Sequence, residues 1–268
     1  DKDDILFGIE QGFDFIAASF VRNAACIQEI KELLWSHNAD IPVIAKIENA
    51  EGIKNLDEII RVADGIMVAR GDLGVEVPAE EVPFLQKEII RKCNDAFKPV
   101  VTATQMLDSM IRNPRPTRAE ATDVANAIYD GTDAIMLSGE TAKGKYPVEA
   151  VKMMNQIAIS TEVHLSTKIK DYRSKYINRG ISAAVAYSAV QTAHNVNAKC
   201  ILASSMSGFT TRIVSKFKPD AQIIGLSPDD AIVRQMQIYW GVRPFKSHKA
   251  ETTKDLLDEL SLIHISEP

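Results

Sequence analysis

The chain has 268 residues, of which 46% are hydrophobic and 25% are charged, and its formal net charge is −5. This mixture is typical of a globular protein and excludes collagenous, low-complexity and disordered chains. No apolar run approaches the roughly 20 residues of a membrane-spanning helix, and the acidic balance argues against broad nucleic-acid binding. Three widely spaced cysteines favour a reducing compartment, so we expect a cytoplasmic protein with neither membrane nor nucleic-acid partners.

Five short apolar runs alternate with longer amphipathic segments over the first 165 residues. The runs are 15–18, 43–45, 65–68, 100–101 and 134–137. Each is too short for a helix and predicts a buried parallel strand. Apolar residues at helical spacing, such as Ile27, Ile30 and Leu34, and a capping box at Thr117–Glu120 predict helices between the runs. Five strand–helix units in succession predict parallel βαβ connections.

Every apolar run ends in polar or charged residues. In a (β/α)8 barrel the carboxyl ends of all strands meet at one mouth, whereas an open doubly wound sheet uses only the strands beside its switch point. The pattern therefore favours a barrel. A whole (β/α)8 barrel takes about 250 residues, so residues 1–165 predict a partial TIM barrel. We expect three further units to precede Asp1 in a longer protein.

A second α/β region is predicted from 180 to 260, after a polar, basic linker at 166–179. It holds an alanine-rich helix at 180–195, strands at 200–203 and 223–226, and a helix at 210–217. The segment Ser227–Asp230 predicts another helix start, with Pro228 at the first helical position. The fold class is thus α/β, a partial TIM barrel followed by a smaller α/β domain. We expect residues 261–268 to be a cloning or sequencing artefact, so His264 is not counted as a ligand.

Charged residues follow two neighbouring strands of the predicted barrel. Glu48 and Asp72 offer the hard oxygen ligands that suit Mg²⁺ or Mn²⁺, although for each acid alone a capping or supporting role is the favoured interpretation. Lys46 shares a strand face with Glu48 and could stabilise charge on a phosphoryl group or an enolate. A structural ion pair with Glu48 or Asp72 is the alternative for Lys46.

Two further features point to an anionic substrate. Gly71 lets the backbone approach a ligand closely and leaves its N–H available to an anionic oxygen. Thr104 is either a strand-end cap or a group that binds substrate oxygen or positions a water. Together with Lys46 and Glu48, these residues predict an anionic substrate held on a divalent metal.

In the second region, a loop rich in hydroxyls follows a strand and opens a helix. Hydroxyls and a helix N-terminus can cradle a phosphate, although a plain helix cap is the alternative. Since the catalytic candidates lie elsewhere, a phosphate here would be regulatory. The candidate effector residues are Ser205, Met206, Ser207, Gly208, Phe209 and Thr210.

Six long motifs resemble the pyruvate kinase family, and Trp240–Val242 extends the resemblance, which covers roughly residues 1–258. The motifs are Ala18–Phe20, Lys46–Asn49, Asp64–Gly74, Ala103–Leu107, Pro114–Glu120 and Asp133–Ala142. The resemblance implies phosphoryl transfer from phosphoenolpyruvate to ADP. It implies that Glu48 and Asp72 bind the metal and that Lys46 stabilises the transferring phosphoryl group and the enolate. It implies that Gly71, Asp72 and Thr104 hold the substrate carboxylate.

The same resemblance implies further properties. Ser138 and Glu140 lie near the point of enolate protonation, and the Ser205–Thr210 loop takes a sugar-phosphate or nucleotide effector, with Ser205 where threonine is usual. Potassium ligands and most nucleotide contacts precede Asp1, and the complete protein is a cytoplasmic, allosteric homotetramer of glycolysis. The chain alone, with an open barrel edge, is expected to be inactive and prone to aggregate.

Two other classes of function remain open from the sequence. A metal-dependent aldolase or lyase acting on pyruvate-like acids could use Lys46 as a Schiff-base residue, although its acidic surroundings favour a protonated, poorly nucleophilic amine. A non-catalytic fragment that senses metabolites through the effector loop is the other alternative. Kinase activity in a protein with the upstream strands would favour the enzyme.

Overall fold

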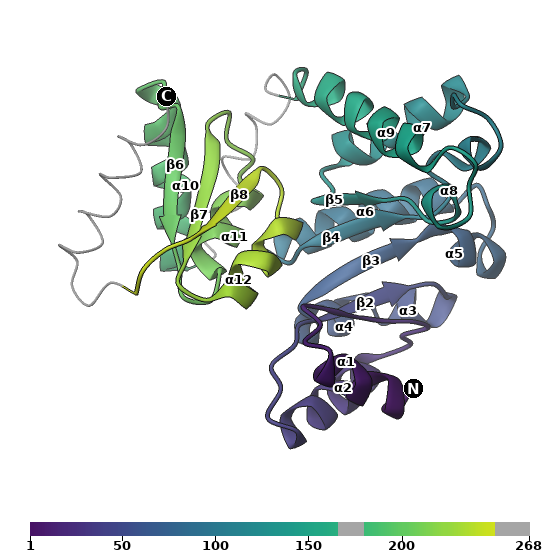
Figure 1. Ribbon diagram of the computed structural model, residues 1–268, viewed down its shortest axis with the longest axis horizontal. Helices are drawn as coiled ribbons and strands as arrows, with labels where there is room; N and C mark the ends of the chain where they lie inside the picture. Colours follow the sequence, from purple (N-terminus) through teal and green to yellow (C-terminus); the bar gives the residue numbers. More distant parts are fainter. Residues whose placement is uncertain (166–179, 250–268) are drawn as a thin grey trace. The chain divides into compact units, whose positions relative to one another are not determined.

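The computed structural model describes residues 1–165 and 180–249, which belong to two compact units. Each unit contains one parallel sheet with helices packed beside it (Figure 1). The predicted linker at 166–179, the end of the second predicted region at 250–260, and the 261–268 tail lie outside the described residues. No helix of the described residues has the length and apolar character needed to cross a membrane.

The five predicted strands of the first unit are confirmed and form one parallel sheet in the order β1-β2-β3-β4-β5. They are β1 Ile16–Ala18, β2 Val43–Ile47, β3 Gly65–Ala69, β4 Val100–Ala103 and β5 Ala134–Met136. Each strand pairs with the one before it, so the order never reverses and the sheet has no switch point of the doubly wound kind. This is the strand arrangement of a barrel segment.

Long helices connect the strands. A short helix begins directly after β3, and short helices follow β2 and β5 after two intervening residues. The helices are α1 Lys2–Glu10, α2 Ala24–Ser36, α3 Ala50–Lys54, α4 Leu56–Val62, α5 Arg70–Glu76, α6 Val82–Asp95, α7 Arg118–Asp130, α8 Gly139–Ala142 and α9 Pro147–Glu162, with a 3-10 turn at Asp108–Ile111. The capping box at Thr117 and Glu120 is confirmed. Figure 1 shows α3, α5 and α8 beyond the carboxyl ends of the strands, which places their first residues beside the strand-end side chains.

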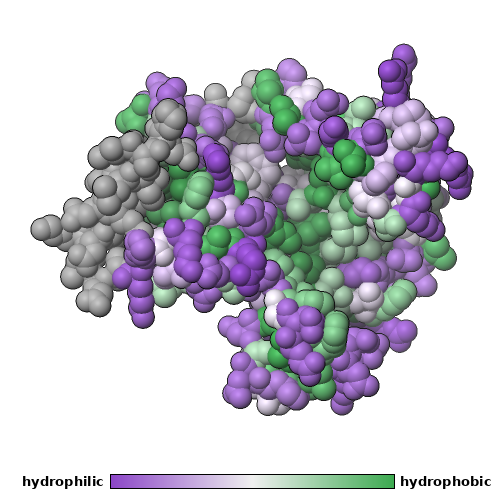
Figure 2. All heavy atoms as spheres, viewed as in Figure 1, coloured by the Kyte–Doolittle hydropathy of each residue, from purple (hydrophilic) through white to green (hydrophobic). Residues whose placement is uncertain are grey.

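Apolar side chains from strands and helices form the core of the first unit. The fully buried members include Ile27, Leu34, Ile59, Ile66 and Ile89. Burying a side chain of this size contributes about 1.5–3 kcal/mol. β3 is buried throughout, whereas every residue of the edge strand β5 is partly exposed. Figure 2 shows apolar residues gathered over the strands of this unit.

Two aspartates tie neighbouring strands together at the amino ends of the sheet. Asp64, just before β3, accepts a hydrogen bond of 2.9 Å from the N–H of Val43 at the start of β2. Asp133, just before β5, accepts one of 2.8 Å from the N–H of Val100 at the start of β4. Lys31 pairs with Asp64 at 2.9 Å. The same type of hydrogen bond thus joins β2 with β3 and β4 with β5 at the end of the sheet opposite to the polar strand ends.

The second unit has a three-stranded parallel sheet in the order β6-β7-β8. Its elements are α10 Ile181–Asn195, β6 Cys200–Ser204, α11 Phe209–Lys216, β7 Gln222–Ser227, α12 Asp230–Gln235, a 3-10 turn at Met236–Ile238 and β8 Val242–Lys246. The two strands and two helices predicted with full bounds are confirmed within one residue at each end. The placement of Pro228 was wrong. The side chain of Asp229 accepts the Ala231 N–H at 2.8 Å and caps a helix that begins after the proline.

Candidate active site

Lys46 and Glu48 lie at the carboxyl end of β2. The Lys46 ammonium is 2.7 Å from Oε1 of Glu48 and donates to Oγ of Ser19 at 2.8 Å. Glu48 is fully buried, and its Oε2 accepts the Phe20 N–H at 2.5 Å. The ion pair between Lys46 and Glu48, one of the two interpretations open from the sequence, is therefore present. It places one cation and one buried carboxylate beside the loop that follows β1.

Asp72 does not end a strand. Because helix α5 begins at Arg70, directly after β3, Asp72 lies in the first turn of that helix with its side chain exposed. An acidic residue in a first turn interacts favourably with the helix dipole. Within residues 1–165 and 180–249, no hydrogen bond or ion pair joins Asp72 to Lys46 or Glu48. The expectation that Glu48 and Asp72 together bind a divalent metal stays a prediction.

The carboxylate of Glu48 has spare capacity as a ligand. Its Oε1 is buried and, despite the nearby ammonium of Lys46, receives no well-aligned hydrogen bond from the described residues. A hard cation suits such an oxygen, and Mg²⁺ typically takes one or two carboxylates and fills its other positions with water and substrate oxygens. No group of three or more His, Cys, Asp or Glu side chains gathers as a metal site in the described part of the chain. The buried Oε1 of Glu48 is therefore suited to a divalent cation whose other positions are filled by water and substrate oxygens.

Gly71 and Thr104 are brought together across β3 and β4. The Gly71 N–H donates to Oγ1 of Thr104 at 2.8 Å, so a protein group engages it, and its contact with an anionic oxygen stays a prediction. A Cβ at Gly71 would lie 3.3 Å from the same oxygen, a tight contact that Thr104 would have to relieve by a small shift. The Thr104 hydroxyl in turn donates to the Ala103 carbonyl at 2.6 Å. A ligand oxygen that displaced this contact would find a hydroxyl and an N–H side by side.

Glu140 is a buried carboxylate that links two loops. Its Oε1 accepts the Leu107 N–H at 3.0 Å, and its Oε2 accepts the Ser138 N–H at 2.7 Å. Glu140 is 2% exposed, so its carboxylate fixes the backbone after β4 to the backbone after β5. Ser138 immediately precedes α8 and is only partly buried. The pair thus combines a structural carboxylate with an accessible hydroxyl.

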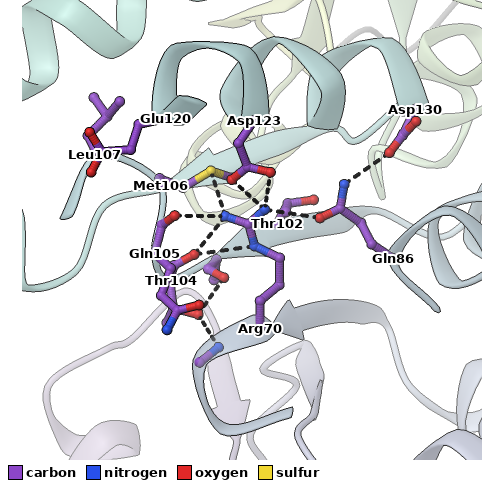
Figure 3. Close-up of polar contacts among 12 residues, drawn as sticks. Arg70, Gln86, Thr102, Thr104, Gln105, Met106, Leu107, Glu120, Asp123 and Asp130 are labelled. Carbon is purple, nitrogen blue, oxygen red and sulfur yellow. Dashed lines mark hydrogen bonds and ion pairs between the residues drawn. The ribbon is translucent and has the colours of Figure 1, made fainter. Parts of the chain in front are cut away.

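Arg70 belongs to the site, and sequence reasoning gave it no role. Its guanidinium is buried and contacts the backbone after β4 together with side chains of α6 and α7 (Figure 3). On its outer side a hollow of about 450 Å³ opens between α6 and α7. Its place between Ala69 and Gly71 is visible in the sequence, but its partners lie 16 to 53 residues away and leave no local pattern.

The candidate effector loop of the second unit lies between β6 and α11. Its start is fixed by the Ser205 N–H, which donates to the Leu226 carbonyl of β7 at 2.9 Å. Gly208 has φ of +70° and is the N-cap of α11, a conformation that favours glycine. Met206 and Phe209 are exposed, and the guanidinium of Arg212 lies 5.5 Å from the centre of the Phe209 ring. The six candidate residues therefore form a loop and the start of α11 beside an arginine, and all of them except the buried Gly208 are at least partly exposed.

Comparison with known proteins identifies both units. Residues 1–151 match the family model described as the pyruvate kinase barrel domain, and residues 183–266 match the pyruvate kinase alpha/beta domain. The pyruvate kinase of Geobacillus stearothermophilus is 56% identical over 260 residues, covering 96% of this chain and 44% of that protein. That of Bacillus licheniformis is 56% identical over 261 residues, covering 97% and 45%. The chain thus spans less than half the length of these curated relatives.

Proposed function

Since this chain belongs to the pyruvate kinase family, we propose that it supplies metal- and substrate-binding groups for phosphoryl transfer from phosphoenolpyruvate to ADP. The bond between phosphorus and the enol oxygen breaks, and a bond forms to a β-phosphate oxygen of ADP. The enolate left behind takes a proton at carbon and becomes pyruvate. The observation that carries the proposal is the Lys46–Glu48 pair at the end of β2, at 2.7 Å, in the row of strand ends that also holds Gly71 and Thr104.

The strand-end residues bind different parts of the reacting groups. The Lys46 ammonium stabilises negative charge on the phosphoryl group and on the enolate oxygen. Bound Mg²⁺ or Mn²⁺, held by Glu48 and Asp72, would neutralise phosphoryl charge. The backbone of Gly71 and Asp72 and the Thr104 hydroxyl hold the substrate carboxylate, which requires the Gly71–Thr104 hydrogen bond to open or be shared.

The protonation step falls to the loop after β5. The Ser138 hydroxyl orients the water that delivers the proton to the enolate carbon, while Glu140 holds the Ser138 backbone at 2.7 Å. Because Glu140 is buried and accepts two backbone N–H groups, its contribution is to position the loop. Both assignments rest on the place of α8 at the carboxyl end of the sheet.

Regulation is proposed for the second unit. The hydroxyls of Ser205, Ser207 and Thr210, with the N-terminus of α11, would bind the phosphate of a sugar-phosphate or nucleotide effector. The observation that favours this is the left-handed Gly208, which turns the loop into α11. We further propose that the complete protein is a cytoplasmic homotetramer that also uses K⁺, bound by residues outside this chain. The proposed domains are a barrel part at 1–165 and a regulatory part at 180–260.

The test is an assay of pyruvate formation by the complete product of the gene that encodes this chain. We expect turnover with phosphoenolpyruvate, ADP and Mg²⁺, and loss of turnover when Mg²⁺ is chelated. Absence of pyruvate formation from a folded protein, with cleavage of a pyruvate-type aldol instead, would replace the kinase by the lyase. The 268-residue chain assayed alone is expected to be inactive, because β1 and β5 each pair on one side only within the described residues.

A further inference from the structure

Arg70 is a buried cation that reaches three segments of the first unit. Its side chain is 7% exposed. Nη2 donates to the backbone carbonyls of Thr104 at 2.8 Å and Gln105 at 3.2 Å, and Nε also points to the Thr104 carbonyl at 3.3 Å (Figure 3). Nη1 donates to Asp123 of α7 at 2.8 Å and to Gln86 of α6 at 3.2 Å. The guanidinium therefore fixes the turn after β4 against two helices.

That turn has an unfavourable backbone conformation. Thr104 and Gln105 have φ values of +67° and +53°, in the left-handed region that residues with a Cβ seldom adopt. A β-branched residue there costs free energy and persists only where its surroundings hold it. The carbonyls of these same two residues are the ones that Arg70 binds. Arg70 is thus the side chain best placed to hold the turn.

The turn determines where the Thr104 hydroxyl lies. Oγ1 of Thr104 accepts the N–H of Gly71, the residue that follows Arg70 in α5. The segment Arg70–Gly71 therefore contacts Thr104 twice, once through the guanidinium and once through the backbone. A planar guanidinium can bind two carbonyls and a carboxylate at once, whereas a lysine ammonium lacks this fork.

We propose that Arg70 is a positioning residue, which places the Thr104 hydroxyl beside the Gly71 N–H by holding the left-handed Thr104–Gln105 turn. The inference rests on the proposed function, in which that hydroxyl and the Gly71 backbone receive the substrate carboxylate. Arg70 itself touches no substrate. Its effect on turnover passes through Thr104.

A double-mutant cycle in the complete gene product tests this route. We expect Arg70→Lys to lower kcat/KM for phosphoenolpyruvate about 10- to 100-fold, because small misplacements of a binding group carry losses of this size. In a Thr104→Ala background the same change should cost less than about threefold, since the hydroxyl that Arg70 places is already absent. Arg91→Lys, at an exposed arginine that pairs with Asp95, is the control and should change neither value. An equal loss in both backgrounds would overturn the proposal.

Hydrogen exchange supplies a readout that does not depend on activity. Arg70→Lys should speed exchange of the Gly71 amide, which donates to Thr104, and leave the Val43 amide bound to Asp64 unchanged. If the wild-type protein makes no pyruvate but this exchange effect is present, the proposed function fails and the positioning role stands. If Arg70→Lys does not fold, Asp123→Asn weakens the same anchor. Unchanged Gly71 exchange in the folded variant used would overturn the proposal.

Discussion

The strand-end site of the first unit and the effector loop of the second unit are built differently. In the first unit, residues at neighbouring strand ends contact each other in pairs, as Ser19 contacts Lys46 and Gly71 contacts Thr104. In the second unit, the candidate residues form one turn whose side chains, such as Met206, are largely exposed. A site made by several strand ends is held by the whole sheet, whereas a single turn depends on its own backbone.

Lys46→Met tests the strand-end site of the first unit and is expected to cause the largest loss of activity. Loss of the ammonium should lower kcat for pyruvate formation by about 10²- to 10³-fold, as removal of a group that stabilises transition-state charge does. Lys31→Met is the matched control, because Lys31 forms an ion pair of similar length with Asp64 at the opposite end of the sheet. Steady-state kinetics of the complete gene product measures kcat for both variants. Equal losses of kcat would contradict a special role for the strand ends.

Glu48→Gln should weaken metal binding. The change removes one of two proposed carboxylate ligands, and we expect the Kd for Mn²⁺ to rise about tenfold or more. Electron paramagnetic resonance of free Mn²⁺ measures this without any turnover. Glu51→Gln, at an exposed carboxylate of α3, is the control. Unchanged Mn²⁺ affinity in Glu48→Gln would remove Glu48 from the metal site.

Gly208→Ala probes the single turn of the second unit. A Cβ at φ of +70° costs about 1 kcal/mol, and we expect a several-fold weaker affinity for a sugar phosphate. Gly241→Ala introduces similar strain at φ of +65°, where a Cβ meets nothing within 4 Å, and should leave that affinity unchanged. Isothermal titration calorimetry with fructose 1,6-bisphosphate and with ribose 5-phosphate compares the two variants. If Gly208→Ala and Gly241→Ala bind the sugar phosphate with equal affinity, the turn at Gly208 does not bind phosphate.

The smallest expected effect is that of Glu120→Gln on the free energy of unfolding at acid pH. Burial alone would raise the pKa of Glu120, but hydrogen bonds from Ser109 and Thr117 outweigh burial and lower the pKa. A carboxyl group with a lowered pKa in the folded state stabilises the protein above its unfolded pKa of about 4.3, and this stabilisation disappears as the pH falls through the folded value. The difference in free energy of unfolding between wild type and Glu120→Gln should therefore shrink below about pH 4. Urea denaturation across pH measures it, and a constant difference would contradict the assignment.

Local patterns allowed much of the fold to be predicted. The five strands and the capping box at Thr117 depend on neighbours in sequence, and both are confirmed. The barrel-like order follows from short βα connections. The position of Asp72 in a helix could not be predicted, because α5 begins without any loop after β3. The roles of Arg70 and Glu140 depend on contacts with segments 16 to 53 residues away, which no local pattern reveals.

The aspartates before β3 and β5 stabilise the sheet at the end opposite to the candidate active site. Asp64 and Asp133 bind the first residues of β2 and β4, so the register of these strands is fixed far from Lys46 and Thr104. Side chains at the opposite end can therefore be substituted without disrupting the pairing of these strands. Evolution can thus alter the chemistry at one end of the sheet while the stability supplied by the other end is retained.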